Sequence, residues 1–205
     1  MDKALYIFAG ANGSGKSTVA FYYREMGLCP ADFICPDLFV ARDKMSDRAA
    51  YISAMQIAEK ARFDRIADGK SFSFETVLST QHKLDFIKFA KSQGYKITAV
   101  YVITSNPEIN LARIARRVSQ GGHDVPKDKV LSRYDKSMAL MFPVIKESDD
   151  AIIYNNSKIY PKIVFNKTAE GLYISQKHDS DELWMQKYIL NPAKENCIEV
   201  VYDEL

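Results

Sequence analysis

The sequence predicts an α/β fold, a three-layer sandwich around a mainly parallel sheet of five strands. Two observations lead to this prediction. Strand-like and helix-like segments alternate between residues 4 and 103, which is typical of βαβ units. Two of the strand-like segments, 4–9 and 97–103, are almost continuously hydrophobic, as strands are when helices cover both faces of a parallel sheet.

The first strand is followed by a predicted helix at residues 17–26, which Gly27 closes. A brief strand at 33–35 and a long helix at 46–67 come next. The long helix carries apolar residues at helical spacing and ends near Gly69. That apolar stripe consists of Ala50, Ala54, Ile57, Ala58, Ala61 and Ile66.

The second half of the core repeats the alternation. Residues 71–74 are a strand candidate, and residues 81–92 form a helix that Gly94 closes. Residues 96–103 are rich in β-branched and aromatic side chains, which favour a strand. The remaining core elements are helices at 107–118 and 127–141 and a fifth strand at 151–154.

The pattern changes after residue 155. Two short strand candidates, 162–165 and 172–175, flank a turn and predict a small β-hairpin, after which the tail is polar and irregular. We therefore divide the chain into a core at residues 1–156 and an extension at residues 157–205 that packs on the core without being an independent domain.

The composition indicates one ordinary globular domain of 205 residues, 47% hydrophobic and 26% charged. A net charge of +2 is too balanced to indicate duplex nucleic acid or an anionic membrane as a partner. The longest apolar runs are far shorter than the about 20 residues of a bilayer span, and no secretory signal pattern is present, so we expect a cytoplasmic protein. Its three cysteines include no CxxC pair and are expected to be small buried hydrophobic residues.

A glycine-rich loop between the first strand and the first helix fits the GxxxxGK[ST] phosphate-binding pattern at every defined position. Glycines let main-chain N–H groups turn inward around a phosphate, and the following helix points its positive N-terminus at the same anion. Lys16 would reach the β- and γ-phosphate oxygens, and Ser17 would hold Mg²⁺ through its hydroxyl. We expect ATP, or alternatively GTP, to bind here with Mg²⁺. The predicted nucleotide-binding residues are Gly10, Ala11, Asn12, Gly13, Ser14, Gly15, Lys16, Ser17 and Thr18.

The rest of the sequence narrows the class of P-loop enzyme. A switch GTPase would carry an NKxD motif, and a motor ATPase would carry a Walker B aspartate at the end of an apolar strand. Neither pattern is visible, since the best buried strand, 97–103, runs into Thr104 without an acid at its end. This favours a small-molecule kinase, in which acids near the acceptor and arginines near the γ-phosphate take those roles.

Two carboxylates follow predicted strands. Asp37 comes directly after the second strand and is placed to accept a proton from an acceptor hydroxyl, with the N-cap of the next helix as an equal alternative. Glu75 follows the third strand, at the end of the sheet where ligands sit in open α/β folds. We expect it to hold a substrate hydroxyl, the alternative being a solvated helix start.

One predicted helix carries three arginines on one face: Arg113, Arg116 and Arg117. Such a face is usually solvated surface, but this one leads into a flexible glycine loop at 120–126 that would let the arginines close over a triphosphate. Arg133 lies on the next helix, and guanidinium groups suit the charge of a phosphoryl-transfer transition state. His123, within the loop, is interpreted as structural.

These residues together resemble the zeta-toxin group of P-loop kinases, in particular its short stand-alone branch of predicted ATPases. The resemblance runs from the phosphate loop to about Asn156. Its further marks are the Pro36-Asp37 turn, Phe74-Glu75-Thr76, Leu78-Ser79, Gly94-Tyr95, Arg117-Val118, Gly121-Gly122-His123-Asp124-Val125-Pro126 and Arg133-Tyr134.

The resemblance implies ATP- and Mg²⁺-dependent phosphorylation of the 3′-hydroxyl of the sugar in UDP-N-acetylglucosamine. Asp37 would be the general base, and Glu75 with Thr76 would hold the sugar nucleotide. The catalytic residues that it implies are Asp37, Lys16, Arg117 and Arg133. Zeta toxins are silenced by a separate helical antitoxin that blocks the nucleotide site, so the resemblance also implies such a partner.

Two other functions remain open at the level of sequence. One is a regulatory or interaction protein that binds ATP without productive transfer. The other is a nucleic-acid end kinase, which shares the phosphate loop and an aspartate base, although the near-neutral charge argues against a basic track for a strand.

Overall fold

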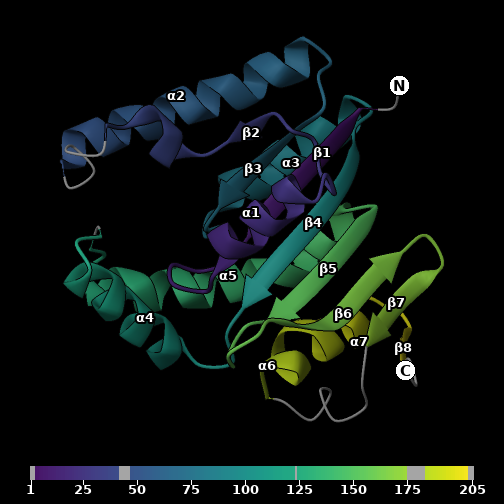
Figure 1. The fold of residues 1–205 in the computed structure, drawn as a ribbon. Helices are drawn as coiled ribbons and strands as arrows, with labels where there is room; N and C mark the ends of the chain where they lie inside the picture. Colours follow the sequence, from purple (N-terminus) through teal and green to yellow (C-terminus); the bar gives the residue numbers. More distant parts are fainter. Residues whose placement is uncertain (1–2, 42–46, 123, 175–182, 203–205) are drawn as a thin grey trace.

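The structure is a computed structural model that describes residues 3–41, 47–122, 124–174 and 183–202. These residues fold around one sheet of eight strands in the order β2-β3-β1-β4-β5-β6-β7-β8. Figure 1 shows the sheet crossing the molecule with helices on both sides of it. The α/β sandwich is confirmed, whereas the count of five strands is wrong because C-terminal strands continue the same sheet.

Five strands pair in parallel and form the core half of the sheet. They are, in sheet order, β2 (Phe33–Ile34), β3 (Phe72–Thr76), β1 (Ala4–Ala9), β4 (Lys96–Ile103) and β5 (Asp150–Asn155). Leu5, Ile7 and Phe8 of the central strand are fully buried, because β1 has a strand on each edge and helices over both faces. Since all five strands run the same way, their carboxyl ends meet at one end of the sheet.

The C-terminal region adds the remaining three strands. The predicted hairpin is present as β6 (Lys162–Thr168) and β7 (Gly171–Ile174), and β6 pairs antiparallel with β5 of the core. The last strand, β8 (Val200–Tyr202), pairs in parallel with β7. Val164 and Phe165 of β6 are buried in the same cluster as the core strands, so the hairpin shares the core's interior.

Helices cover both faces of the sheet. On one face, α1 (Lys16–Glu25) buries Val19 and Tyr23 against Phe8. On the opposite face, α3 (Gln81–Ser92) and α5 (Lys127–Glu147) join the largest hydrophobic cluster of the described residues. Figure 1 shows this arrangement, with α1 in front of the strands and α3 and α5 behind them.

Two further helices complete the described core. One is α2 (Arg48–Ala67), whose N-terminus is capped by the side chain of Asp47. The buried face of α2 includes Ala54, Ala58 and Ile66. The other is α4 (Pro107–Ser119), which packs against α5. Among the helices that the structure describes, none has the length and apolar character to cross a bilayer.

Two predictions about helical segments are wrong. Helix α5 does not stop at residue 141 but continues through Pro143 to Glu147, because Phe142, Val144 and Ile145 remain buried against the sheet. The tail beyond β7 is not irregular throughout.

The tail packs by means of a few apolar side chains. It contains α6 (Leu183–Met185), a π-helical segment η4 (Gln186–Leu190) and α7 (Asn191–Glu195). Trp184, Met185 and Ile189 are buried in the large cluster. The burial of these large side chains holds the tail against the core.

Candidate active site

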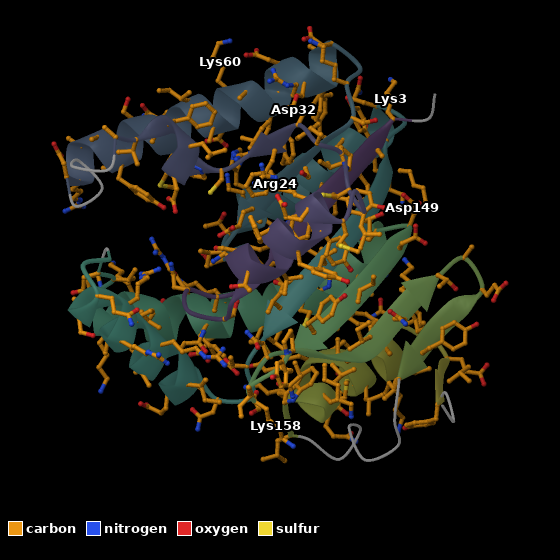
Figure 2. All side chains as sticks on the ribbon, viewed as in Figure 1. Lys3, Arg24, Asp32, Lys60, Asp149 and Lys158 are labelled. Carbon is orange, nitrogen blue, oxygen red and sulfur yellow. The ribbon has the colours of Figure 1, made fainter. Side chains whose placement is uncertain are left out.

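The glycine-rich loop lies between β1 and α1, at the carboxyl end of the parallel strands. Figure 2 marks the two ends of the sheet: Lys3 and Asp149 precede β1 and β5, and Lys158, after β5, lies at the other end. Gly15 has a φ of +95°, and a Cβ on it would lie 2.2 Å from Nδ2 of Asn156. A side chain at this position is therefore excluded both by backbone conformation and by space.

The loop presents main-chain donors that have no protein partner. In the described part of the chain, the N–H groups of Gly13, Gly15, Lys16 and Ser17 make no hydrogen bond to any protein acceptor. Three of these groups open helix α1, where unsatisfied donors and the helix dipole favour an anion. The Lys16 side chain is nearly buried beside them. Together these groups fit a polyphosphate.

Glu75 lies directly against the first turn of α1. Its Oε1 accepts a hydrogen bond of 2.9 Å from Oγ of Ser17 and lies 3.4 Å from Nζ of Lys16. This contact arises because β3 is the neighbour of β1, with Glu75 in register beside Phe8. The alternative of a solvated helix start is wrong, since Glu75 belongs to β3 and its side chain is 12% exposed.

The strand at 97–103 does not end in an acid, but another strand next to β1 does. That segment is β4, which flanks β1 on one edge, and Thr104 follows it. The acid stands on the other edge of β1, at the end of β3. The strand order, which the sequence pattern did not reveal, decides which strand end faces the loop.

Side chains distant in sequence hold the back of the loop. Asn110 donates to the carbonyl of Asn12 at 2.7 Å, and Asn156 donates to the carbonyl of Ser14 at 2.8 Å. The Arg113 guanidinium donates to main-chain carbonyls of Ser14 at 3.5 Å and of Asn156 at 2.7 Å. Arg113 thus holds the loop by its main chain, and Asn110 and Asn156 are site residues that sequence reasoning missed.

Asp37 follows β2 at the carboxyl end of the parallel strands and is paired with Tyr51. Asp37 lies in a short 3₁₀ helix, η1 (Pro36–Phe39), whose N-cap is Cys35, so the N-cap alternative for Asp37 is wrong. Tyr51, in the first turn of α2, is hydrogen-bonded to the Asp37 side chain. Burial raises the pKa of Tyr51 to about 12, and the Asp37 charge acts in the same direction. Tyr51 is therefore protonated at neutral pH and donates to the carboxylate.

The other predicted site residues are dispersed. Arg133 of α5 donates from Nη1 to Oδ1 of Asn12 at 3.3 Å, and its charge acts on Tyr51, so it lies between the loop and the Asp37 region. Arg116 and Arg117 are on the exposed part of α4. The Thr76 hydroxyl oxygen accepts the Leu78 N–H at 3.1 Å and fixes the turn after β3. His123 lies outside the described residues.

The three cysteines differ in their surroundings. Cys35 is buried and Cys29 is partly buried, but Cys197 is exposed, so the expectation that all three are buried is wrong for Cys197. Burial raises the pKa of the Cys35 thiol to about 12, and the carboxylates of Glu75 and Asp37 act in the same direction.

The cysteine environments give a prediction for thiol reactivity. Because the thiolate is the nucleophile, iodoacetamide at pH 8 is expected to alkylate Cys35 at least about a hundredfold more slowly than Cys197. Peptide mass spectrometry over time measures the two rates, with protein unfolded in urea as the control in which they converge. Similar rates in the folded protein would contradict the burial of Cys35.

Known proteins resemble the chain in sequence and in fold. No protein-family model matches it. An uncharacterized protein of Haemophilus influenzae is 31% identical over 135 residues, which make up 65% of this chain and 93% of that protein.

Two solved complexes share the fold at low identity. The AvrRxo1-ORF1:-ORF2 complex with ATP superposes with a TM-score of 0.68 at 15% identity, covering 84% of this chain and 60% of the matched chain. The PezAT chromosomal toxin–antitoxin system of Streptococcus pneumoniae superposes with a TM-score of 0.59 at 14% identity, covering 92% of this chain and 79% of the matched chain. The chain thus spans less than two thirds of the AvrRxo1 chain that it matches.

Proposed function

Because the chain belongs to the same family as the Haemophilus influenzae protein and has the fold of zeta-toxin-like P-loop kinases, we propose that it is an ATP-dependent phosphotransferase acting on a hydroxyl of a small acceptor. One observation carries this proposal. Free main-chain donors and the Lys16 ammonium converge at the N-terminus of α1 beside Glu75, and Asp37 follows β2 at the same end of the sheet. A donor phosphate and an acceptor hydroxyl need such neighbouring sites.

The loop residues bind and orient the donor. The main-chain N–H groups of Gly13, Gly15, Lys16 and Ser17 would surround the β-phosphate, and Lys16 would reach toward the γ-phosphate as a point charge. Ser17, which is exposed, would hold Mg²⁺ through its hydroxyl. When bound, Mg²⁺ neutralises charge on the transferring phosphate oxygens. ATP is the proposed donor, and GTP is an alternative. The phosphate loop would not distinguish the two, because its groups suit the phosphates and not the nucleobase.

Asp37 prepares the acceptor. Its carboxylate takes the proton of the acceptor hydroxyl as that oxygen bonds to the γ-phosphorus and the bond to the β–γ bridging oxygen breaks, leaving ADP. Tyr51 donates to the same carboxylate and so orients it. Arg133 lies close enough to the loop to stabilise charge on the group in transfer.

The acceptor and a protein partner are the finer parts of the proposal. We propose a sugar nucleotide such as UDP-N-acetylglucosamine as the acceptor, held in part by Thr76 after β3, on the basis of the resemblance in sequence motifs. Arg116 and Arg117 would close over the phosphates with the glycine loop that follows α4. Because the structures with a similar fold include a toxin–antitoxin system, we also propose a separate antitoxin. A cytoplasmic location is a further part of the proposal.

A transfer assay tests the function. The protein is incubated with γ-labelled ATP, Mg²⁺ and separate panels of UDP-sugars, nucleosides and oligonucleotides, and the labelled product is identified. A labelled sugar nucleotide or other small alcohol supports the proposal. Label on an oligonucleotide end supports a nucleic-acid kinase instead, and ATP binding without transfer to any panel member supports a regulatory protein.

The support of the loop gives a further prediction. Asn156→Ala removes the 2.8 Å hydrogen bond to the Ser14 carbonyl while Arg113 still contacts that carbonyl. ATP affinity is expected to fall by about 3- to 10-fold, the effect of one hydrogen bond. Titration calorimetry measures it, with Asn166→Ala on β6 as the matched control. An unchanged affinity would show that the loop keeps its shape without this side chain.

A further inference from the structure

A cluster of charged side chains joins the middle of α2 to the first turn of α3. Oε1 of Glu59 lies 2.5 Å from Nε2 of His82 and 3.6 Å from Nζ of Lys83. The same oxygen lies 3.9 Å from Nη2 of Arg62. In the described part of the chain, no second acid pairs with Lys83 or Arg62. Two cations and a histidine therefore share one carboxylate, and the cluster has an excess of positive charge.

Arg62 is buried in this cluster with unused hydrogen-bond donors. The residue is 4% exposed, and its guanidinium lies 5.1 Å from the ring centroid of Phe74 and 5.6 Å from that of Phe86. Its Nε is buried without an acceptor, and the guanidinium makes no hydrogen bond to any described residue. Because buried donors are normally paired, an oxygen acceptor from outside the protein would complete this group.

The first turn of α3 adds further donors beside the two cations. Thr80, the N-cap of this 12-residue helix, makes no side-chain cap bond. The main-chain N–H groups of Gln81 and His82 have no protein acceptor within the described residues. Burial lowers the pKa of Lys83, and the charge of Arg62 acts in the same direction. An anion would relieve the repulsion between the cations and satisfy the free N–H groups.

We propose that Arg62, Lys83, His82 and the N-terminus of α3 form a second anion site, separate from the phosphate loop, which takes a phosphate or carboxylate group. The site goes beyond the proposed function, because the donor phosphates are held at α1. When no anion is bound, Glu59 is the counter-ion of both cations. A bound anion would share the cations with Glu59, so this carboxylate opposes its binding.

The position of the second site suggests two sources for the anion. Tyr51, which is paired with Asp37, and Arg62 lie on the same face of α2, about 16 Å apart along the helix axis. Helix α3 begins after β3, at the carboxyl end of the parallel strands. An acceptor whose hydroxyl reaches Asp37 would therefore place an acidic group at the other end of its length here. A separate small anion has the same chemistry.

A titration with inorganic phosphate tests the site. The phosphate loop is first filled with the non-hydrolysable β,γ-imido analogue of ATP and Mg²⁺. Phosphate then replaces chloride at constant ionic strength, and ¹⁵N NMR follows the main-chain amide signals of Gln81 and His82. A saturable shift of both signals is the expected result, because these N–H groups would donate to the anion. Without such a shift the second site does not exist.

Two variants are expected to change the phosphate Kd in opposite directions. Lys83→Gln removes a cation and is expected to weaken binding about 10-fold. Glu59→Gln removes the competing carboxylate and is expected to strengthen binding about 3-fold or more. Lys88→Gln, an exposed lysine of the same helix, is the matched control and is expected to leave the Kd unchanged. Thermal melts establish that each variant is folded.

The sign of the Glu59 effect separates an anion site from a purely structural ion-pair cluster. Weaker phosphate binding in Glu59→Gln would overturn the proposal, and so would an unchanged Kd in Lys83→Gln. If either variant does not fold, the other still decides. If the parent does not bind the ATP analogue, the proposed function fails, whereas the amide signals still report on the second site.

The transfer assay distinguishes the two sources of the anion. If the acidic group belongs to the acceptor, Lys83→Gln raises the KM of the acceptor by about the same factor as the phosphate Kd and leaves the Kd of ATP unchanged. If the acceptor KM stays constant while the phosphate Kd rises, the site takes a separate anion. Both results support an anion site between α2 and α3.

Discussion

Asp37→Asn is expected to bind ATP about as tightly as the parent and to transfer phosphate about 10²- to 10⁴-fold more slowly, the usual contribution of a general base. The amide keeps the size of the side chain and can still accept the Tyr51 hydrogen bond, but it cannot take a proton from the acceptor. No hydrogen bond or ion pair joins Asp37 to residues 10–18 within the described structure, so the donor site should be intact. Initial rates with the acceptor found in the transfer assay, and calorimetry with ATP, measure the two effects.

Asp128→Asn is a suitable control for this experiment. Asp128 lies in the exposed first turn of α5, so the same chemical change there removes a surface charge away from Asp37. A large loss of transfer in both variants would point to net charge or stability instead of proton transfer. A loss of ATP binding in Asp37→Asn would place the carboxylate in the donor site, against the assignment made above.

Trp184→Ala is expected to lower the free energy of unfolding by about 3–5 kcal/mol, the range for removing a large buried aromatic side chain. Trp184 is 5% exposed and belongs to the hydrophobic cluster that also contains the core strands. Its loss would therefore leave a cavity between the tail and the sheet. Urea unfolding followed by fluorescence of the tyrosines and by circular dichroism measures the change.

The neighbouring residue supplies a matched control. Leu183 is adjacent in sequence but 87% exposed, so Leu183→Ala is expected to change stability by no more than about 0.5 kcal/mol. If the two variants are equally stable, the tail is not packed on the core as the structure has it. A smaller slope of the unfolding free energy against urea concentration in Trp184→Ala alone would indicate that the tail detaches before the sheet unfolds.

Elements with strong local signals could be predicted from sequence. The helix at 81–92 and the strand at 96–103 are found with the predicted bounds, because Gly94 ends the helix with a φ of +81° and the strand is a continuous run of β-formers. The phosphate loop was recognisable for the same reason. Its glycines, its lysine and its position between strand and helix are all adjacent in the chain.

Features that depend on distant contacts were not recognisable. Nothing near Asn156 or Asn110 in the sequence marks them, because their partners in the loop lie 142 and 98 residues away. Tyr51 was missed because its relation to Asp37 depends on how α2 packs on η1. The position of Glu75 beside Lys16 follows from strand order, which βαβ alternation alone does not determine.

The long-range hydrogen bonds that shape the phosphate loop determine when the protein can bind a nucleotide. Its carbonyls are tied by side chains from α4 and from the turn after β5, so the loop acquires its shape only once the chain as far as Asn156 has come together. A nascent or partly opened molecule should then have little hold on ATP, and cellular ATP would act as a ligand that selects the completed fold. Local opening of either brace, far from the phosphates in sequence, would be a route by which spent nucleotide escapes.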